Sequence, residues 1–224
     1  MDDIRIIKVK QSVFANNNSR AEEVRKKLKE KNVYLVNLMS SPGSGKTTFL
    51  VNLINRLKKD LRIGVMEADI DATVDAETIS TKTGVRSVQI HTSGECHLDA
   101  KMVDDSLEGF GIDGLDLVFL ENIGNLVCPA EFDTGATSSF ELLSIPEGDD
   151  KPLKYPLMFT VANVVVFTKM DAISVFDFDL KKAEEHILKL NPNAKFFPVS
   201  AKTDEGMDKI AQYLLEEVKK YQAK

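Results

Sequence analysis

The stretch YLVNLMSSPGSGKTT, residues 34–48, decides the fold because an apolar run leads directly into a glycine-rich loop. Residues 34–39 predict a buried β-strand, and helical spacing of apolar residues follows the loop at Leu50, Leu53, Ile54 and Leu57. A strand, a loop of small residues and a helix in this order are typical of a phosphate-binding loop. The consensus for such loops begins with glycine where this chain has Ser40, and its other residues match. The alternative, a chance turn of glycine and serine, leaves the flanking strand and helix unexplained.

The residue types in this loop predict nucleotide binding. Small residues let the backbone fold around phosphates, and the helix N-terminus adds favourable partial positive charge. Lys46 is expected to reach the β- and γ-phosphates, and the Thr47 hydroxyl is expected to ligate Mg²⁺. The predicted contacts to the nucleotide in this loop are Gly43, Ser44, Gly45, Lys46, Thr47 and Thr48.

Apolar runs recur along the chain with helix-length amphipathic segments between most of them. Besides residues 34–39, they cover residues 62–67, 86–91, 116–121, 140–145, 163–168 and 195–200. Strands that are almost entirely apolar, alternating with helices, predict an α/β protein whose parallel sheet is covered on both faces.

Composition limits the class of protein. The chain has 224 residues, of which 43% are hydrophobic and 29% charged, as in an ordinary globular domain. A net charge of −6 gives no overall attraction to nucleic acid or to an anionic membrane. No apolar run approaches the roughly 18 residues that span a bilayer, and the charged start has no secretory core, so a cytoplasmic protein is expected. Two cysteines make no disulfide framework and are free for packing or metal.

Residues 1–31 are more polar than the rest, and we interpret them as an N-terminal extension and helix preceding a P-loop GTPase domain at residues 32–224. The run NNNS, residues 16–19, predicts a break, with Ser19 as the N-cap of a charged helix. Mixed charge favours a solvated face for this helix. Packing on the domain or binding a partner are the alternatives.

Acidic residues at strand ends are candidates for a Mg²⁺ site. Glu121 closes an apolar run and begins the pattern E-x-x-G with Gly124, which resembles the D-x-x-G of GTPases. Glu121 is expected to hold a magnesium-bound water, and the Gly124 N–H to sense the γ-phosphate. Asp69, Asp71 and Asp75 follow the strand at 62–67. We favour Asp75 for a catalytic or magnesium-side role and Asp69 for supporting contacts, although an acidic, solvated loop accounts for at least one of the three.

Two later motifs favour guanine over adenine. Thr168-Lys169-Met170-Asp171 ends an apolar run, and the Asp171 carboxylate can accept from both N1–H and the exocyclic amine of guanine. Adenine offers no such pair of donors. The usual motif is N-K-x-D, with Thr168 here in place of Asn, and the Lys169 stem can lie along the ring. The S-A-K element, whose backbone N–H meets guanine O6, is expected at Ser200, Ala201 and Lys202.

Sulfur and imidazole ligands form a possible metal site. Cys96 and His97 are adjacent, and Cys128 lies four residues beyond Gly124. Thiolate and imidazole favour Zn²⁺, Ni²⁺ or Cu over Mg²⁺, but the chain has no C-x-x-C pair and three ligands do not complete a tetrahedron. Water, Glu95 or a second protomer are candidates for the missing ligands. The alternative is two buried free cysteines and an ordinary surface histidine, and His91 and His186 are expected to be structural.

The combined motifs resemble the HypB family of hydrogenase nickel-incorporation GTPases, which are metal-chaperone and signal-recognition-type P-loop GTPases. The resemblance extends from about residue 20 to the C-terminus. It rests on SSPGSGKTT (40–48), TSGECHLDA (92–100), ENIGNLVCPAEFD (121–133), SIPEGDDKPLKYP (144–156), FTKMD (167–171) and VSAK (199–202). The related urease nickel GTPase family UreG carries a Cys-Pro-His motif that this chain lacks.

This resemblance implies a Rossmann-like fold with a mostly parallel seven-stranded sheet. It implies slow GTP hydrolysis coupled to homodimerisation, and nickel delivery to the large-subunit precursor of [NiFe] hydrogenase together with a HypA-type chaperone. The implied cofactors are GTP/GDP, Mg²⁺, and Ni²⁺ or Zn²⁺. The implied roles are phosphate and magnesium binding for Lys46 and Thr47, proximity to magnesium and the γ-phosphate for Asp75 and Glu121, and a metal site at the dimer interface for Cys96, His97 and Cys128.

Many members of the family carry an N-terminal C-x-x-C-G-C nickel site, whereas residues 1–31 here contain neither Cys nor His. We therefore expect the site around Cys96 to carry any nickel handling. Three alternatives stay open: a nickel GTPase for another metalloenzyme such as urease, a P-loop ATPase such as a partitioning or ligase enzyme, and a non-catalytic scaffold that holds nucleotide and zinc.

Overall fold

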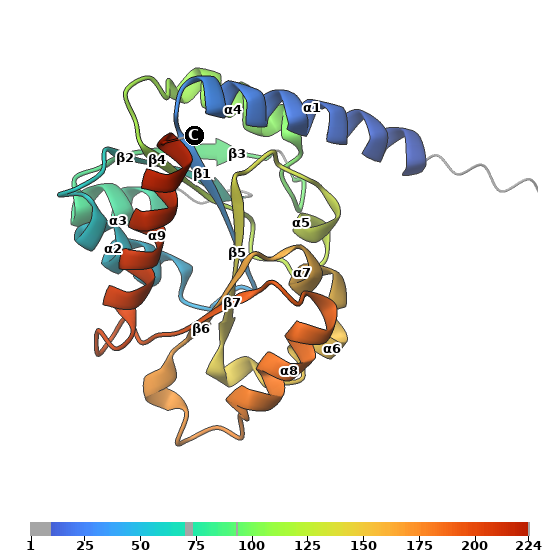
Figure 1. The fold of residues 1–224 in the computed structure, drawn as a ribbon, viewed down its shortest axis with the longest axis vertical. Helices are drawn as coiled ribbons and strands as arrows, with labels where there is room; N and C mark the ends of the chain where they lie inside the picture. Colours follow the sequence, from blue (N-terminus) through green and yellow to red (C-terminus); the bar gives the residue numbers. More distant parts are fainter. Residues whose placement is uncertain (1–9, 70–73, 93, 224) are drawn as a thin grey trace, which may run out of the picture.

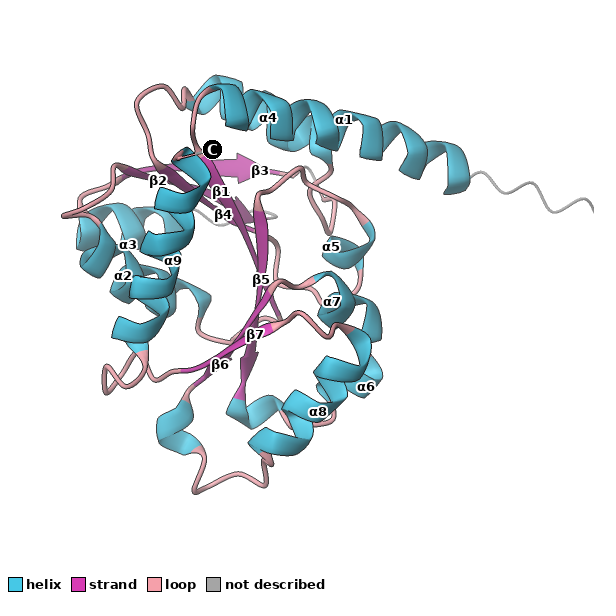
Figure 2. Ribbon diagram, in the orientation of Figure 1, coloured by secondary structure: helices cyan, strands magenta, loops and turns pink. Residues whose placement is uncertain are grey.

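The computed structural model describes residues 10–69, 74–92 and 94–223, and its centre is a sheet of seven strands (Figures 1 and 2). The strands lie in the order β3-β2-β4-β1-β5-β6-β7, and every neighbouring pair is parallel. The prediction of a seven-stranded parallel α/β sheet is therefore confirmed. The strands are β1 (Tyr34–Ser40), β2 (Ile63–Asp69), β3 (Arg86–His91), β4 (Leu117–Glu121), β5 (Ser138–Ser144), β6 (Val164–Thr168) and β7 (Lys195–Pro198).

Helices cover both faces of the sheet. One face packs against α2 (Lys46–Leu57), α3 (Val74–Thr83) and α9 (Met207–Gln222). The other face carries α1 (Lys10–Glu30), α4 (Ala100–Phe110), α5 (Cys128–Glu131), α6 (Lys151–Lys154), α7 (Pro156–Val161) and α8 (Leu180–Leu190), with the short 3₁₀ turns η1 (Ile145–Glu147) and η2 (Met170–Ala172) at strand ends. Within the described ranges, no helix combines the length and the apolar character needed to cross a membrane.

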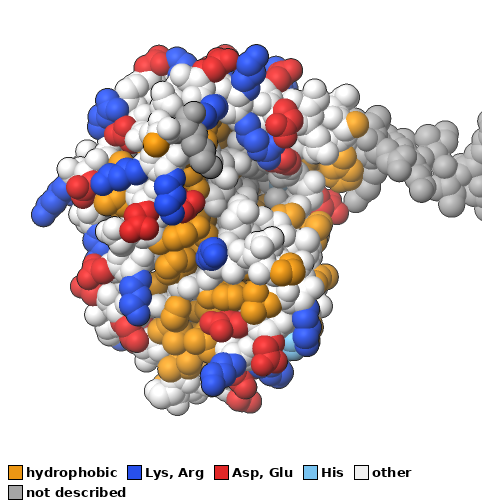
Figure 3. All heavy atoms as spheres, in the orientation of Figure 1, with side chains coloured by type: hydrophobic (Ala, Val, Ile, Leu, Met, Phe, Trp, Pro, Cys, Tyr) orange, Lys and Arg blue, Asp and Glu red, His pale blue; other side chains and the backbone are white. Residues whose placement is uncertain are grey.

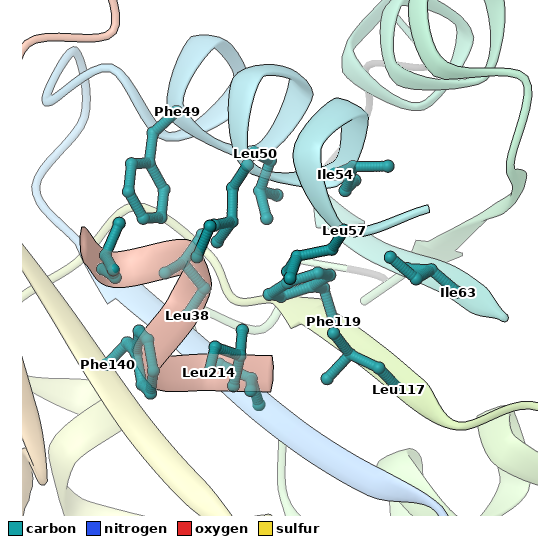
Figure 4. Close-up of a cluster of buried hydrophobic side chains, with 14 of the residues drawn as sticks. Leu38, Phe49, Leu50, Ile54, Leu57, Ile63, Leu117, Phe119, Phe140 and Leu214 are labelled. Atoms are coloured by element: carbon teal, nitrogen blue, oxygen red, sulfur yellow. The ribbon is translucent and has the colours of Figure 1, made fainter. Parts of the chain in front are cut away.

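The packing of α2 onto the sheet places the glycine-rich loop. Every residue of β1 is buried, as the central position of a parallel sheet requires. In Figure 4 the side chains of Phe49, Leu50 and Leu57 on α2 point toward Leu38 of β1 and Phe119 of β4. This apolar contact holds the N-terminus of α2 directly after the carboxyl end of β1.

Helix α1 differs from its prediction, because it runs without a break through residues 16–19. The side chain of Asn17 explains the continuity. Its Nδ2 donates to the Asp133 carbonyl at 2.9 Å, and its Oδ1 accepts from the Ala100 N–H at 2.8 Å. Asparagine lowers helix propensity by well under ~1 kcal/mol, and two tertiary hydrogen bonds at a mostly buried position outweigh that. The predicted break at NNNS and the Ser19 cap were therefore wrong.

One face of α1 joins the core. Ala21, Val24 and Leu28 are fully buried, and the last two share a hydrophobic cluster with residues of α4 and β4. The opposite face carries exposed charges, and acidic and basic side chains are interspersed over the surface seen in Figure 3. Arg25 pairs with Asp133 at 2.6 Å at the edge of the buried face. Helix α1 thus packs on the sheet, whereas a domain boundary between residues 31 and 32 stays a prediction.

The packing of α1 predicts a stability loss for Leu28→Ala. Truncating a fully buried leucine removes apolar burial and leaves a cavity, which costs about 3 kcal/mol. The free energy of unfolding should be measured by urea titration. Lys26→Ala is the matched control on the exposed face of the same helix, and it should change that free energy by less than about 0.5 kcal/mol. Equal unfolding midpoints for the two variants would contradict the docking of α1.

Candidate nucleotide and metal site

The glycine-rich loop has the backbone geometry of an anion-binding site. Gly43 and Gly45 have φ values of +74° and +96°, a left-handed region that side chains with Cβ rarely adopt. Gly45 is the N-cap of α2, so Lys46 and Thr47 occupy its first turn. The first N–H groups of a helix have no partner within the helix and favour a negative charge. Glycine at positions 43 and 45 allows the backbone turn that directs the N–H groups of the loop and of the first turn of α2 toward a common centre.

A cavity of about 270 Å³ opens beside this loop and matches the predicted base site. Phe49 and Val199 give it apolar walls, which suit a planar ring. Its lining includes predicted contacts from all three motifs, namely Ser44, Gly45, Thr48, Lys169, Asp171, Ala201 and Lys202. The other predicted contacts, Gly43, Lys46, Thr47 and Ser200, lie in the loop or at the strand end next to it, outside the lining.

Asp171 is held as a hydrogen-bond acceptor at the edge of this cavity. The Ser200 hydroxyl donates to its Oδ1 at 2.7 Å, and the Lys202 ammonium lies 3.7 Å from its Oδ2. The hydrogen bond from Ser200 is the main cause that lowers the pKa of Asp171 below its ordinary value, and the charge of Lys202 adds to it. The carboxylate is therefore ionised at neutral pH, which is the state that accepts two N–H donors.

The Thr168 and Lys169 side chains hydrogen-bond the end of β6 to the phosphate loop. The Thr168 hydroxyl, which replaces the usual asparagine, donates to the Ser44 carbonyl at 2.8 Å. Lys169 has a left-handed backbone, with φ of +60°, and its Nζ donates to the Gly43 carbonyl at 2.7 Å. Threonine at this position thus still joins the base-binding and phosphate-binding segments.

Two glutamates lie side by side at the ends of β2 and β4. Glu121 and Glu67 are register partners, so both side chains point to the same face of the sheet, and each is 2% exposed. Glu67 was not predicted, because register between strands is not visible in one sequence. The available signal was that both apolar runs end in a glutamate. A Cβ on Gly124 would lie 3.2 Å from Pro42, so glycine allows the E-x-x-G segment to contact the phosphate loop.

The other predicted acids lie outside what the structure describes. Asp71 is not among the described residues, and the side chains of Asp69 and Asp75 are not described either. Their roles, including the catalytic and magnesium-side role of Asp75, stay predictions. Thr47 and Glu121 supply oxygen donors of the type that Mg²⁺ prefers, at the helix start and the strand end beside the loop.

The two cysteines meet although 32 residues separate them in the chain. Cys96 lies between β3 and α4, Cys128 is the first residue of α5, and their sulfurs are 2.8 Å apart. Both thiols are free, and hydrogen bonding to Cys128 is the main cause that raises the pKa of Cys96. His97 Nδ1 is 4.0 Å from the Cys96 sulfur, and its ring stacks on Phe132 with centroids 3.8 Å apart.

The described part of one chain does not assemble a complete metal site. In it, His, Cys, Asp and Glu form no group of three or more that could hold a metal ion. The two sulfurs are together, and the His97 ring next to them stacks on Phe132 with its Nδ1 4.0 Å from the Cys96 sulfur. A closed site would require a rotation of His97 or ligands from another molecule.

A buried carboxyl lies behind the phosphate loop. Glu141 on β5 is 1% exposed, and among the described residues neither of its oxygens has a hydrogen-bond partner. Burial is the main cause that raises its pKa well above the ordinary value, and the charge of Glu147 acts in the same direction. The ammonium groups of Lys46 and Lys151 oppose this shift. Burial therefore favours the neutral form of Glu141, close to the lysine of the phosphate loop.

Fold and site together define a P-loop nucleotide-binding protein with a pair of thiols close in sequence to its E-x-x-G segment. The family model for the CobW/HypB/UreG nucleotide-binding domain matches residues 34–198. The chain belongs to this family.

Its similarities lie within the HypB group of the family. The chain is 41% identical to the hydrogenase maturation factor HypB of Rhizobium leguminosarum bv. viciae over 214 residues, which cover 96% of this chain and 71% of the relative. The crystal structure of HypB from Helicobacter pylori in complex with nickel matches with a TM-score of 0.85 and 40% identity, over 92% of this chain and 96% of that one. The HypB structure from Archaeoglobus fulgidus matches with a TM-score of 0.83 and 34% identity, over 91% and 99%.

The burial of Glu141 predicts a pH-dependent stability. The unfolded carboxyl ionises near its ordinary pKa of 4.5, whereas the folded one stays protonated to higher pH. Unfolding therefore releases a proton above pH 4.5, and stability falls as pH rises from there toward the folded pKa. Glu141→Gln should flatten this fall in urea titrations between pH 5 and 8. Glu30→Gln, on an exposed residue, should leave the slope unchanged, and identical slopes for all three proteins would contradict the interpretation.

Proposed function

We propose that this protein is a GTP-hydrolysing metallochaperone that binds nickel or zinc and helps to insert nickel into [NiFe] hydrogenase. The observation that carries the proposal is the contact of the Cys96 and Cys128 sulfurs, 2.8 Å apart, at the end of the segment that follows the E-x-x-G motif. Two thiols suit a soft cation such as Ni²⁺ or Zn²⁺. The relatives support the same direction, since they are named hydrogenase maturation factors and one was crystallised with nickel.

The nucleotide side of the mechanism follows from the loop and the cavity. Asp171 accepts from the guanine edge, while Phe49 and Val199 flank the ring and Lys46 binds the β- and γ-phosphates. The first turn of α2 directs its free N–H groups at the same phosphates. Thr47, Glu121 and Asp75 would hold Mg²⁺, which supplies charge neutralisation for the departing phosphate. Glu121 and Asp75 are the candidates for orienting the attacking water.

Metal binding is coupled to the nucleotide through the segment from Gly124 to Cys128. The Gly124 N–H contacts the γ-phosphate of GTP but has no such partner with GDP. GTP therefore orders the segment and moves Cys128 relative to Cys96, and hydrolysis releases it again. A ligand shifts such an equilibrium only through contacts that differ between the two states, and the γ-phosphate is that difference. By linkage, metal must change GTP affinity by the same factor.

Dimerisation completes the metal site. One chain offers two sulfurs and one imidazole, and a second copy doubles this set across a shared interface. GTP favours the dimer because it orders the segment that carries Cys128. A HypA-type chaperone and the hydrogenase large-subunit precursor are the proposed partners in nickel transfer, and the cytoplasm is the proposed location.

Nickel delivery to urease is a second candidate function. Relatives from Helicobacter pylori, 39% identical over 214 residues, are named hydrogenase/urease maturation factors. The nucleotide and metal chemistry is the same in both cases. The two functions differ only in the recipient protein. A pull-down with the hydrogenase precursor and with the urease precursor would show which of them binds this protein.

Asp171→Asn tests the choice of nucleotide. The amide can no longer accept two guanine N–H bonds, and each charge-assisted bond contributes about 1.5–3 kcal/mol, so GDP affinity should fall about 100-fold or more. Xanthosine diphosphate, which carries a carbonyl in place of the amine, should bind the variant better than GDP does. Asp177→Asn is the matched control on an exposed residue nearby. Competition of ATP and GTP with equal strength at the wild-type protein would favour the P-loop ATPase alternative.

The metal switch is tested by titrating Ni²⁺ and Zn²⁺ with GDP and with a non-hydrolysable GTP analogue bound. The two affinities should differ about tenfold, the usual size of such coupling. Cys128→Ala should weaken metal binding at least tenfold while nucleotide affinity stays within a few fold. His186→Ala, on a half-buried histidine of α8, is the control.

Size-exclusion chromatography of the same samples reports association. The GTP-analogue complex should elute as a dimer and the GDP complex as a monomer. Equal metal affinities and equal oligomeric states of the GDP and GTP-analogue complexes would contradict the proposed coupling of nucleotide and metal binding.

A further inference from the structure

Ser40 stands where the phosphate-loop consensus has glycine, and its hydroxyl is at the centre of the loop's hydrogen bonds. The side chain is fully buried at the end of β1. Its Oγ accepts from Lys46 Nζ at 2.9 Å and from the Ser44 hydroxyl at 2.7 Å, and it donates to the Ser41 carbonyl at 2.7 Å. A hydroxyl has one donor and two acceptor positions, so all three are used. The extended backbone at Ser40 lies outside the left-handed region that needs glycine.

The chemistry of this acceptor suits a phosphate-binding lysine. A carboxylate next to Lys46 would neutralise the ammonium and compete with phosphate. The Ser40 hydroxyl is neutral, so it orients the ammonium into the loop and leaves its charge for the ligand. The ammonium has three donors, and one bond to Ser40 leaves two for phosphate oxygens.

We propose that Ser40 is a positioning residue that holds the Lys46 ammonium in its phosphate-binding place before the nucleotide arrives. The inference rests on the proposed nucleotide function of the loop. The hydrogen bond from Lys46 to this hydroxyl already orders the long, flexible lysine side chain in the free protein. Nucleotide binding therefore loses less side-chain conformational entropy. Ser44, which lines the base cavity, is fixed by the same hydroxyl.

A double-mutant cycle tests whether Ser40 acts through Lys46. Ser40→Ala should raise the dissociation constant for fluorescent GDP about tenfold, the effect of one lost hydrogen bond to a charged group. In a Lys46→Met background the same change should have less than a twofold effect, because the ammonium it positions is gone. Ser138→Ala, a buried serine at the start of β5, is the control and should leave GDP binding unchanged.

A second measurement needs no nucleotide. Lys46 in the free protein should be acylated several-fold faster by a succinimidyl ester in Ser40→Ala than in wild type, as read by peptide mass spectrometry. The exposed Lys26 serves as the reference in the same sample.

Equal effects of Ser40→Ala in both backgrounds, tighter GDP binding, or unchanged acylation of Lys46 would each overturn the proposal. Failure of wild-type protein to bind GDP would instead overturn the proposed function, while the acylation result still tests the contact between Ser40 and Lys46.

Discussion

The burial of β1 between two helical layers is the constraint on which the site depends. Leu38 faces the cluster formed with α2 and α9, and Met39 faces the cluster formed with α7 and α8. Because both faces of β1 are apolar, the strand is buried only at the centre of the sheet. This fixes the position of its carboxyl end. The loop after Ser40 therefore starts where Glu121 of β4 and Thr168 of β6 also end their strands. Apolar packing thus brings these strand ends close to the loop. The hydrogen bonds of Thr168 and Lys169 to the loop carbonyls then stabilise that arrangement.

Three glutamates are buried on the central strands of the sheet. Glu67, Glu121 and Glu141 are each at most 2% exposed. Burying a carboxyl destabilises the folded state unless a partner or a proton compensates it. Natural proteins tolerate such groups mainly where charge is handled, and a triphosphate with its cation is a large charge. The three glutamates are therefore candidates for a role beside the nucleotide site.

The strands were predictable because a continuous apolar run leaves little choice of structure, although the edge strands β3 and β7 are only partly buried. All seven runs became strands, and the loop glycines 43 and 45 have the left-handed backbone that their motif requires. Tertiary contacts were not predictable. Asn17 continues α1 because two distant backbone groups bond its amide, and Glu67 joins Glu121 through strand register. The sequence also pointed to Cys96 and Cys128 as a pair, but only the tertiary packing that places the start of α5 next to the loop before α4 brings their sulfurs together.

A short segment connects the phosphate loop to the thiols. The proposed coupling of nucleotide binding to metal binding depends on this segment. Gly124 and Cys128 are four residues apart, a span of at most about 14 Å when extended. Gly124 contacts the phosphate loop at Pro42, and Cys128 begins a helix whose Ala130 packs in the cluster with α7. Between them the segment lacks regular structure, and its Leu126 packs in the same cluster. His97 lies against the Cys96 sulfur and stacks on Phe132, which follows the same short helix. Cys128 and the ring that stacks on His97 thus belong to one short helix and its cap, which connects two of the candidate metal ligands structurally.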